Sequence, residues 1–446
     1  MSLGSVAVLR WRGAFSVVTR ERVLIHNLVV AGGTVAAGLL GVAFQVVVSH
    51  KLSPADYGGV FAVVTLLTLI GLPASGFSLL MARQTSRDLA TGEHALSGTL
   101  LRRGNWALLI AGGALAAALV LLSPALAVAL NVPAPLFIAA AIGLPFGLAL
   151  PLLMGEFQGE QRFFTFSSLS VAQAGLKLIG AVALGLIWGP TGIIAGISLA
   201  PVMVYLIALS QIRRKKGPAL VDSWWRPAAA YLAVIIPSTL ALAILLSADV
   251  LIVKHYFPTQ AAGEFSAVAA LGRAIFWGAS GVALVLFPKV TARNILGHGG
   301  SQLVAISLAL VALGGLLGLG LLSLTSTWLL TAFAGSAYSE AAGFLPWYAV
   351  GMTLLGGVAV LIATLQSRGT PAFLAVLLPL TALEPVALLL FHQNLTQVVV
   401  VIDISMALIL GGLGAFYVLQ ERRLLRTHLT GPTAVQARVA PAGVTR

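Results

Sequence analysis

Residues 303–330 read LVAISLALVALGGLLGLGLLSLTSTWLL, a stretch without a single charged side chain. A helix needs roughly 20 apolar residues to cross about 30 Å of hydrocarbon, so this stretch is long enough to span a membrane. It lacks the alternation of polar and apolar residues that marks transmembrane β-strands. A helix also satisfies its own backbone hydrogen bonds in lipid, so the stretch predicts a membrane-spanning helix.

Eleven further segments are also long and predominantly apolar, in a chain of 446 residues that is 59% hydrophobic and 9% charged. We therefore predict an all-α polytopic membrane protein with 12 transmembrane helices. The predicted spans are 27–48, 58–82, 106–126, 136–154, 164–188, 193–212, 228–253, 265–287, 303–330, 344–365, 373–390 and 397–419.

Positive charge marks alternate gaps between the predicted spans. Of the 26 Lys and Arg residues, 22 lie before the first span, in every second gap, or after the last span, the exceptions being Lys51, Lys177, Lys254 and Arg273. By the positive-inside rule these gaps and both termini are cytoplasmic, and Lys51 and Lys254 lie at the outer ends. The net charge of +13 then reflects topology and attraction to anionic headgroups, not nucleic-acid binding.

Short internal matches predict a duplication. An offset of 205 residues aligns Gly58 and Ala74-Ser75-Gly76 with Gly263 and Ala279-Ser280-Gly281, and an offset of 209 aligns Gln211-Ile212-Arg213-Arg214 with Gln420-Glu421-Arg422-Arg423. Two parallel-repeat six-helix bundles around a central cleft would follow. The predicted boundaries are a cytoplasmic lead-in at 1–25, a first bundle at 26–212, a cytoplasmic linker at 213–227, a second bundle at 228–419 and a cytoplasmic tail at 420–446.

Several classes of chemistry are disfavoured. The chain has no Cys, and its seven His residues are scattered among unrelated loops and helix ends, so we expect no metal site and no cofactor. The outer gaps are short, the longest being 332–343, which leaves no room for an outer catalytic domain. A phosphate-binding loop of the nucleotide-hydrolysing type is missing from the sequence, so uphill transport would need an ion, the membrane potential or a partner protein. We predict that the protein is not an enzyme.

Five ionisable residues lie inside predicted spans: Lys177, Asp249, Arg273, Glu384 and Asp403. Each costs about 2.5–3.5 kcal/mol at a helix centre on insertion scales, so each should face the protein interior or water and mark a functional pathway.

Four of these five residues form two pairs, and the members of each pair lie at the same predicted depth below the outer membrane surface. Asp249 lies eight residues before Phe257 and Arg273 eight after Phe265, so both lie roughly 12 Å below the outer surface and an ion pair is feasible, whether functional or purely structural. Glu384 and Asp403 likewise lie about 10 Å below that surface. Two close acids require a cation between them, so a site for Na⁺ or H⁺ is the sharper interpretation. The alternative is that the two side chains point into different cavities.

Lys177 lies near mid-membrane on a small or polar helical face. Ser170, Gln173, Lys177, Gly180 and Ala183 follow one another at steps of three and four, the spacing of a single face. This face is the best candidate in the first bundle for lining a hydrated cleft. Its positive charge suits a substrate that bears phosphate.

The segment Leu52-Ser53-Pro54-Ala55-Asp56-Tyr57-Gly58 resembles a loop of the polysaccharide flippases of the O-antigen and exopolysaccharide type. Ser247-Ala248-Asp249, Gly263-Glu264-Phe265-Ser266-Ala267 and Leu286-Phe287-Pro288-Lys289 resemble that family's seventh and eighth spans. The superfamily to which these flippases belong also includes multidrug exporters and peptidoglycan-precursor flippases.

The resemblance implies an alternating-access flippase for an isoprenoid-diphosphate-linked oligosaccharide in the bacterial inner membrane, with membrane lipids and polysaccharide-assembly proteins as further partners. It implies substrate binding by Lys177 and Arg273, to which we add Gln173 and Ser170 from their helical face. It also implies a cation site on spans seven, eleven and twelve, where Asp249, Glu384 and Asp403 fall, although Glu384 departs from the shorter acid or amide usual there.

Three other functions stay open. A cation-coupled multidrug exporter of the same superfamily predicts a cleft dominated by acids and aromatic residues. A membrane-embedded glycosyltransferase, polymerase or ligase would present acids or histidines on substantial outer loops, for which Glu264, Glu340 and His392 are weak substitutes. A passive scaffold leaves the five buried charges unexplained.

Overall fold

The computed structural model describes residues 28–92, 95–212, 225–295, 301–368 and 371–430. Its described elements are helices, with no strand among them, which confirms the predicted all-α class. Within these residues, ten helical stretches are long and apolar enough to cross a membrane. The lead-in at 1–25, together with most of the linker at 213–227 and of the tail at 420–446, lies outside the described residues.

All twelve predicted spans fall on helices, although the ten stretches divide the chain differently. The helix α8 (Phe163–Gln211) contains two predicted spans, because Trp188 (φ −121°, ψ 15°) and Gly189 (φ 58°, ψ −139°) leave helical geometry between them. The predicted eighth span lies on α11 (Thr259–Ile295), outside the ten.

The chain forms two compact units. The first comprises Met1–Thr239, Lys254–Ala267 and Leu330–Ser339, and the second comprises Leu240–Val253, Val268–Leu329 and Glu340–Arg446. The helices that precede α8 are an unlabelled first helix (Leu28–Lys51), α2 (Pro54–Gly71), η1 (Leu72–Ala74), α3 (Ser75–Thr91), α4 (Ala95–Thr99), η2 (Leu100–Gly104), α5 (Asn105–Leu130), α6 (Ala134–Ala141) and α7 (Leu144–Gly159).

The remaining helices follow in chain order. They are α9 (Trp225–Leu245), α10 (Ala248–Tyr256), α11, α12 (Ser301–Ala334), η3 (Ser336–Phe344), α13 (Leu345–Ser367), η4 (Pro371–Phe373), α14 (Leu374–Leu390) and α15 (Leu395–Thr430).

Local chemistry explains where several helices begin and break. Ser53 caps α2: its hydroxyl accepts the backbone N–H of Asp56 at 3.2 Å, and Pro54 occupies the first turn, where a missing N–H costs nothing. Pro73 lies in the 3₁₀ turn that separates α2 from α3, and Pro145 lies in the first turn of α7, just after the break from α6. These two prolines therefore lie where predicted spans are divided, whereas Pro151, Pro237 and Pro379 lie inside helices.

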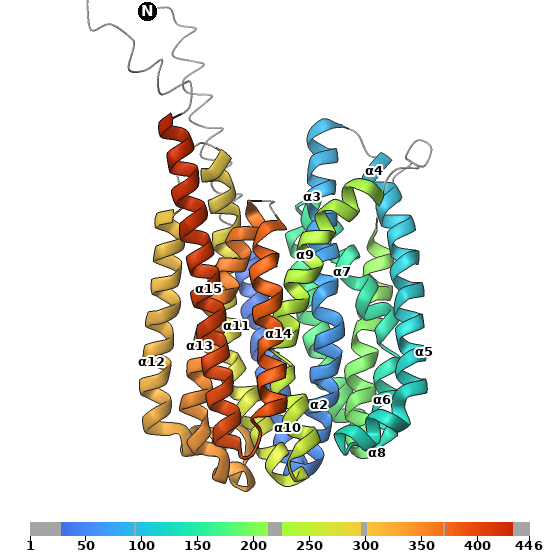
Figure 1. Cartoon of the computed structure of the whole chain (residues 1–446). Coiled ribbons are helices and arrows are strands. Elements are labelled where there is room, and N and C mark those ends of the chain that lie inside the picture. Colours follow the sequence, from blue (N-terminus) through green and yellow to red (C-terminus); the bar gives the residue numbers. More distant parts are fainter. Residues whose placement is uncertain (1–27, 93–94, 213–224, 296–300, 369–370, 431–446) are drawn as a thin grey trace, which may run out of the picture. The chain divides into compact units, whose positions relative to one another are not determined.

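Close backbone approach organises the first unit around α7, which packs against α3, α5 and α8 (Figure 1). A Cβ on Gly112 of α5 would lie only 2.5 Å from the Cα of Pro145, and one on Gly155 of α7 would overlap the carbonyl oxygen of Ser78 on α3. Small residues permit this spacing, as is usual between membrane helices. Around these contacts lies a hydrophobic core that includes Met81, Leu152 and Phe157.

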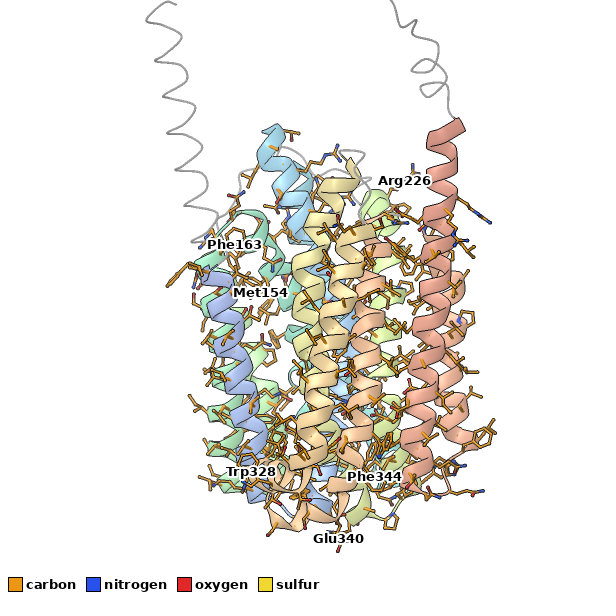
Figure 2. The ribbon with its side chains drawn as sticks, turned by 90° about the vertical axis from the view of Figure 1, so that its left-hand side faces the viewer. Met154, Phe163, Arg226, Trp328, Glu340 and Phe344 are labelled. Carbon is orange, nitrogen blue, oxygen red and sulfur yellow. The ribbon has the colours of Figure 1, made fainter. Side chains whose placement is uncertain are left out.

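In the second unit α15 packs against both α13 and α14. Here too glycines face side chains of a neighbouring helix, since a Cβ on Gly357 of α13 would come within 3.1 Å of Leu410 on α15. Figure 2 shows Trp328, Glu340 and Phe344 at one end of this unit. In the first unit, Phe163 and Arg226 lie toward a common end.

Candidate functional site

The second unit contains a buried ion pair. Arg273 Nη2 on α11 lies 2.8 Å from Asp249 Oδ1 on α10, and the two residues are 9% and 1% exposed. The pair that equal depth made feasible therefore forms. Because a lone charge in this environment would be costly, each residue depends on the other.

Tyr348 of α13 completes a three-helix network. Its hydroxyl donates to Asp249 Oδ2 at 2.6 Å and accepts from Arg273 Nε at 3.3 Å, and its side chain is 0% exposed. Both carboxylate oxygens of Asp249 are thus used. The ring lies so close to α11 that a Cβ on Gly272 would overlap its Cδ1 atom, which fixes the network in position.

Glu384 of α14 lies near this network, within electrostatic range of both Asp249 and Arg273. Its side chain is 0% exposed, and neither carboxylate oxygen has a hydrogen-bond partner among the described residues. Buried polar groups are rarely left in this condition, so Glu384 is a candidate for binding a ligand that the protein itself does not supply.

Thr381 extends this polar surface by one helical turn. Its buried hydroxyl oxygen also lacks a hydrogen-bond partner in the described part of the chain. The buried residues of α14 form one stripe, in which Leu377 and Leu388 enclose Thr381 and Glu384. Two oxygen-bearing side chains therefore project together from an otherwise apolar face.

The charges of this site leave one unit uncompensated. With Asp249, Arg273 and Glu384 all ionised, the group carries a net charge of −1, which one monovalent cation or one proton would neutralise. Carboxylate and hydroxyl oxygens are ligands suited to a hard cation such as Na⁺. Within the described residues there is no group of three or more His, Asp or Glu that could hold a metal ion.

Asp403 has a different environment on α15. It packs against α13, where a Cβ on Gly351 would lie 2.7 Å from its Oδ1 atom, and this oxygen has no hydrogen-bond partner among the described residues. Glu384 instead neighbours Asp249 and Arg273. The shared cation site stays a prediction. The described neighbours of Glu384 and Asp403 differ, because equal depth does not fix the rotation of a helix.

Lys177 belongs to the first unit and lies on the first arm of α8. Its ammonium is 4.2 Å from the ring centroid of Phe44 on the first helix, a cation–π contact. The described residues provide no carboxylate within ion-pair distance of it. The face predicted around it includes two other half-buried polar residues: Ser170, whose hydroxyl donates to the Phe166 carbonyl at 2.9 Å, and Gln173.

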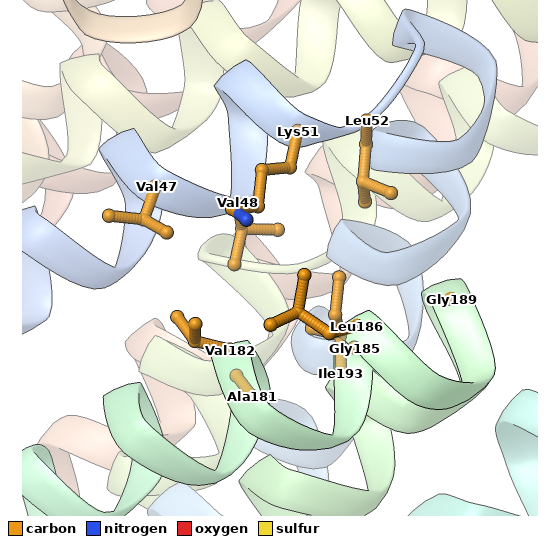
Figure 3. A pocket seen from close by; sticks show the side chains of 10 residues that line it. All are labelled: Val47, Val48, Lys51, Leu52, Ala181, Val182, Gly185, Leu186, Gly189 and Ile193. Atoms are coloured by element: carbon orange, nitrogen blue, oxygen red, sulfur yellow. The ribbon is translucent and has the colours of Figure 1, made fainter.

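A second feature of the first unit is a cavity of about 290 Å³ between the end of the first helix and the tip of the α8 hairpin. Figure 3 shows Lys51 extending from the first helix toward Val182 and Leu186 of α8. Lys51 is the single ionisable residue among its ten lining residues, so the cavity is an apolar groove with one cation.

Sequence reasoning missed three residues. Tyr348 lies four residues after Phe344 and reads as an interfacial aromatic residue, whereas Thr381 could have been found from its i, i+3 spacing to Glu384. Lys254, expected as an outer charge, is only 1% exposed and lies within electrostatic range of Asp56. The charge pattern along the chain gives the side of the membrane but not the burial of a side chain.

Solved transporter structures share this fold. A multidrug resistance MATE family transporter of the MOP superfamily, in an inward-facing conformation, matches with a TM-score of 0.71 at 14% identity, over 89% of this chain and 96% of that one. The eukaryotic MATE transporter AtDTX14 has a TM-score of 0.65 at 14% identity, over 90% and 96%. The lipid II flippase MurJ, in an inward closed conformation, has a TM-score of 0.65 at 13% identity, over 86% of each chain.

No protein-family model matches the chain. No curated protein matches its sequence either. At these identities the structural likeness shows the fold alone, which is shared by a multidrug resistance MATE family transporter and by the lipid II flippase MurJ.

Proposed function

We propose that this multi-pass membrane protein is an alternating-access flippase that moves an isoprenoid-diphosphate-linked oligosaccharide across the bacterial inner membrane for surface polysaccharide biosynthesis. The observation that carries the proposal is Lys177, a cation within a membrane span whose contact is an aromatic ring and not an acid. An ammonium without a carboxylate partner remains available to an anionic group of the substrate.

The chemistry of such a substrate fits the residues around Lys177. The diphosphate would meet the ammonium, while Gln173 and Ser170 offer hydrogen-bonding groups to the sugars. The isoprenoid chain would stay in the bilayer. Arg273 serves the substrate in this proposal only after it leaves Asp249, because the pair occupies its guanidinium in the present structure.

Coupling is assigned to the second unit. One Na⁺ or H⁺ would bind beside Glu384, whose charge is the uncompensated one, and Asp249 would contribute through its pair with Arg273. Asp403 is retained as a separate acid that binds or releases a cation against α13. Coupling requires that the ion bind one transport state more tightly than the other.

A cation-coupled multidrug exporter is the second candidate, because two of the similar structures are multidrug or MATE transporters. Such a protein would favour acids where it binds cationic drugs, whereas Lys177 would repel them. Membrane lipids and polysaccharide-assembly proteins are the other partners that we propose for the flippase.

The test compares Lys177→Ala and Lys177→Arg with Lys51→Ala, a control that removes a lysine from an exposed position. Binding of an undecaprenyl-diphosphate-linked oligosaccharide to purified protein in neutral-lipid nanodiscs should weaken by about tenfold or more in Lys177→Ala, because a hydrogen bond to a charged group is lost. Lys177→Arg should retain most of the affinity, and Lys51→Ala should resemble the wild type.

Transport of ethidium into proteoliposomes distinguishes the second candidate. A flippase should not transport ethidium, and Lys177→Ala should not create such an activity. Wild-type affinity of Lys177→Ala for the oligosaccharide lipid, or robust ethidium transport by the wild type, would overturn the proposal.

A further inference from the structure

A small pocket opens at the predicted cytoplasmic end of the first unit, and none of its lining residues belongs to the candidate site described above. Its volume is about 160 Å³, and its walls come from α3, from the α4 and η2 segment, and from α9. Sites that enclose drug-sized ligands measure about 300–1,000 Å³, so this pocket can hold the head of a larger molecule but not the whole of it.

The α3 wall changes from apolar to cationic along its length. Leu80, Arg83, Gln84 and Arg87 line the pocket at the i, i+3, i+4 and i+7 positions of one helical face. Because a helix rises about 1.5 Å per residue, Leu80 lies roughly 10 Å deeper in the membrane than Arg87. The wall therefore has the polarity of an amphiphile that stands along the membrane normal with its anionic end toward the cytoplasm.

The other walls repeat this arrangement. Leu96 and Leu100 supply apolar surface from the α4 and η2 segment, and Ala228 and Tyr231 face the pocket from α9. The guanidinium carbon of Arg83 lies 5.2 Å from the centroid of the Tyr231 ring, which holds the arginine against α9. The phenol hydroxyl and the guanidinium thus belong to the same polar end.

Among the described residues, no acid forms an ion pair with the two arginines. Asp88 is the nearest acid along α3, but it is buried, and its carboxylate accepts hydrogen bonds from Gln84 Nε2 at 2.6 Å and from the backbone N–H of Ser97 at 2.9 Å. Neither Arg83 nor Arg87 forms an ion pair within the described part of the chain. Both guanidinium groups keep donors for an external anion.

The pocket lies at the height of the inner headgroup layer. The helix α9 begins at Trp225, which is exposed and carries the guanidinium of Arg226 at 5.7 Å from its ring centroid. Exposed tryptophans and arginines at helix ends mark the membrane interface. Tyr231, six residues further along, reaches just below that layer.

We propose that this pocket binds the phosphate-bearing head and the first part of the hydrocarbon chain of an anionic lipid from the cytoplasmic leaflet. The planar guanidinium groups of Arg83 and Arg87 hold the phosphate oxygens, Tyr231 donates to them, and Leu80, Leu96 and Leu100 contact the chain. This site is independent of the transported substrate and of the proposed flippase activity.

The test uses the full chain in neutral detergent, with binding measured by native mass spectrometry. The probes are dioleoylphosphatidylglycerol, undecaprenyl diphosphate, dioleoylphosphatidylcholine and inorganic phosphate. The double variant Arg83→Ala/Arg87→Ala is compared with Arg102→Ala/Arg103→Ala, which removes two arginines from the same cytoplasmic gap but from outside the pocket lining. Both variants change net charge and topology signals equally.

In the first double variant, the affinity for at least one of the two anionic lipids should fall by about tenfold or more, because charge-assisted hydrogen bonds are lost. The control should stay close to the wild type, and the variant Arg83→Lys/Arg87→Lys should be intermediate. Phosphatidylcholine and inorganic phosphate should bind far more weakly than the anionic lipids. The variant's melting temperature reports separately on folding.

The two anionic lipid probes distinguish a membrane phospholipid from an isoprenoid lipid carrier as the bound molecule. A loss confined to phosphatidylglycerol assigns the pocket to a membrane phospholipid, and a loss confined to undecaprenyl diphosphate assigns it to a lipid carrier. Equal losses in both double variants would indicate general surface charge and overturn the proposal. Retained binding of both lipids in Arg83→Ala/Arg87→Ala, or inorganic phosphate binding as strong as lipid binding, would overturn it as well.

Discussion

Gly58 and Gly263 lie backbone to backbone, so closely that a Cβ on Gly58 would come within 2.8 Å of the Cα of Gly263. The two glycines also occupy equivalent positions under the 205-residue offset of the predicted duplication. They lie near the starts of α2 and α11, within the same compact unit.

The contact predicts that added volume is destabilising there. Gly58→Ala should lower stability by about 1–3 kcal/mol through overpacking, and Gly263→Ala by more, because its Cβ would overlap the carbonyl oxygen of Pro54. Thermal unfolding in detergent measures the effect. Gly71→Ala on the same helix is the control, since its Cβ would enter open space, and equal melting temperatures for all three variants would contradict the packing argument.

The Asp249–Arg273 pair should appear in a double-mutant cycle as a double variant that is more stable than the sum of the two single variants predicts. Arg273→Met should cost about 3–5 kcal/mol, because it leaves the carboxylate of Asp249 buried without its cation, and Asp249→Asn is the other single variant. The double variant Asp249→Asn/Arg273→Met should recover much of this loss, since it removes both charges of the pair. Melting temperatures of the four proteins give the coupling, and a double variant as unstable as the sum of the single variants would argue against a direct interaction.

Substitution of Glu384 should affect stability differently from substitution of Arg273. Glu384→Gln keeps the side-chain shape but removes a buried charge that has no hydrogen-bond partner among the described residues, so it should not destabilise the protein in the absence of Na⁺. If Na⁺ is the coupling ion, the wild-type melting temperature should rise with Na⁺ concentration and that of the variant should not. Potassium at equal ionic strength is the control.

A variant that unfolds well below the wild type would show that Glu384 is satisfied within the protein. The proton would be identified as the coupling ion if the melting temperature of the wild type did not depend on Na⁺ and the Glu384→Gln variant did not transport. Thr381→Val removes the neighbouring hydroxyl without removing a charge. This substitution should weaken the rise of the melting temperature with Na⁺ concentration.

The order of the helices and the heights of their charges follow from the sequence, because span length and helical rise are fixed by the bilayer and the backbone. The meeting of Asp249 with Arg273 could therefore be predicted. The separation of Glu384 from Asp403 could not, since rotation about a helix axis depends on packing such as that of Gly351 against Asp403. The burial of Lys254 could not be predicted from the sequence either, because it depends on segments distant in the chain.

Arg368 forms a contact in the second unit that should stabilise α15. Its Nη2 atom lies 2.5 Å from Glu421 Oε2, and its Nη1 donates to Gln420 Oε1 at 2.9 Å. In the first unit Arg162 donates to the Gln211 carbonyl at 3.0 Å, so an arginine from the corresponding gap meets the equivalent glutamine in both halves. The predicted duplication would account for this recurrence.

Arg368→Ala should destabilise the end of α15 by about 1.5–3 kcal/mol, the usual range for hydrogen bonds to charged groups. Faster amide hydrogen exchange near Gln420 would report this local loosening. Arg368→Lys should have an intermediate effect, because a lysine cannot reproduce the two-pronged contact with Gln420 and Glu421. Arg162→Ala should have a smaller effect, since its carbonyl contact is exposed to solvent, and unchanged exchange in Arg368→Ala would show that the end of α15 is held by its apolar face alone.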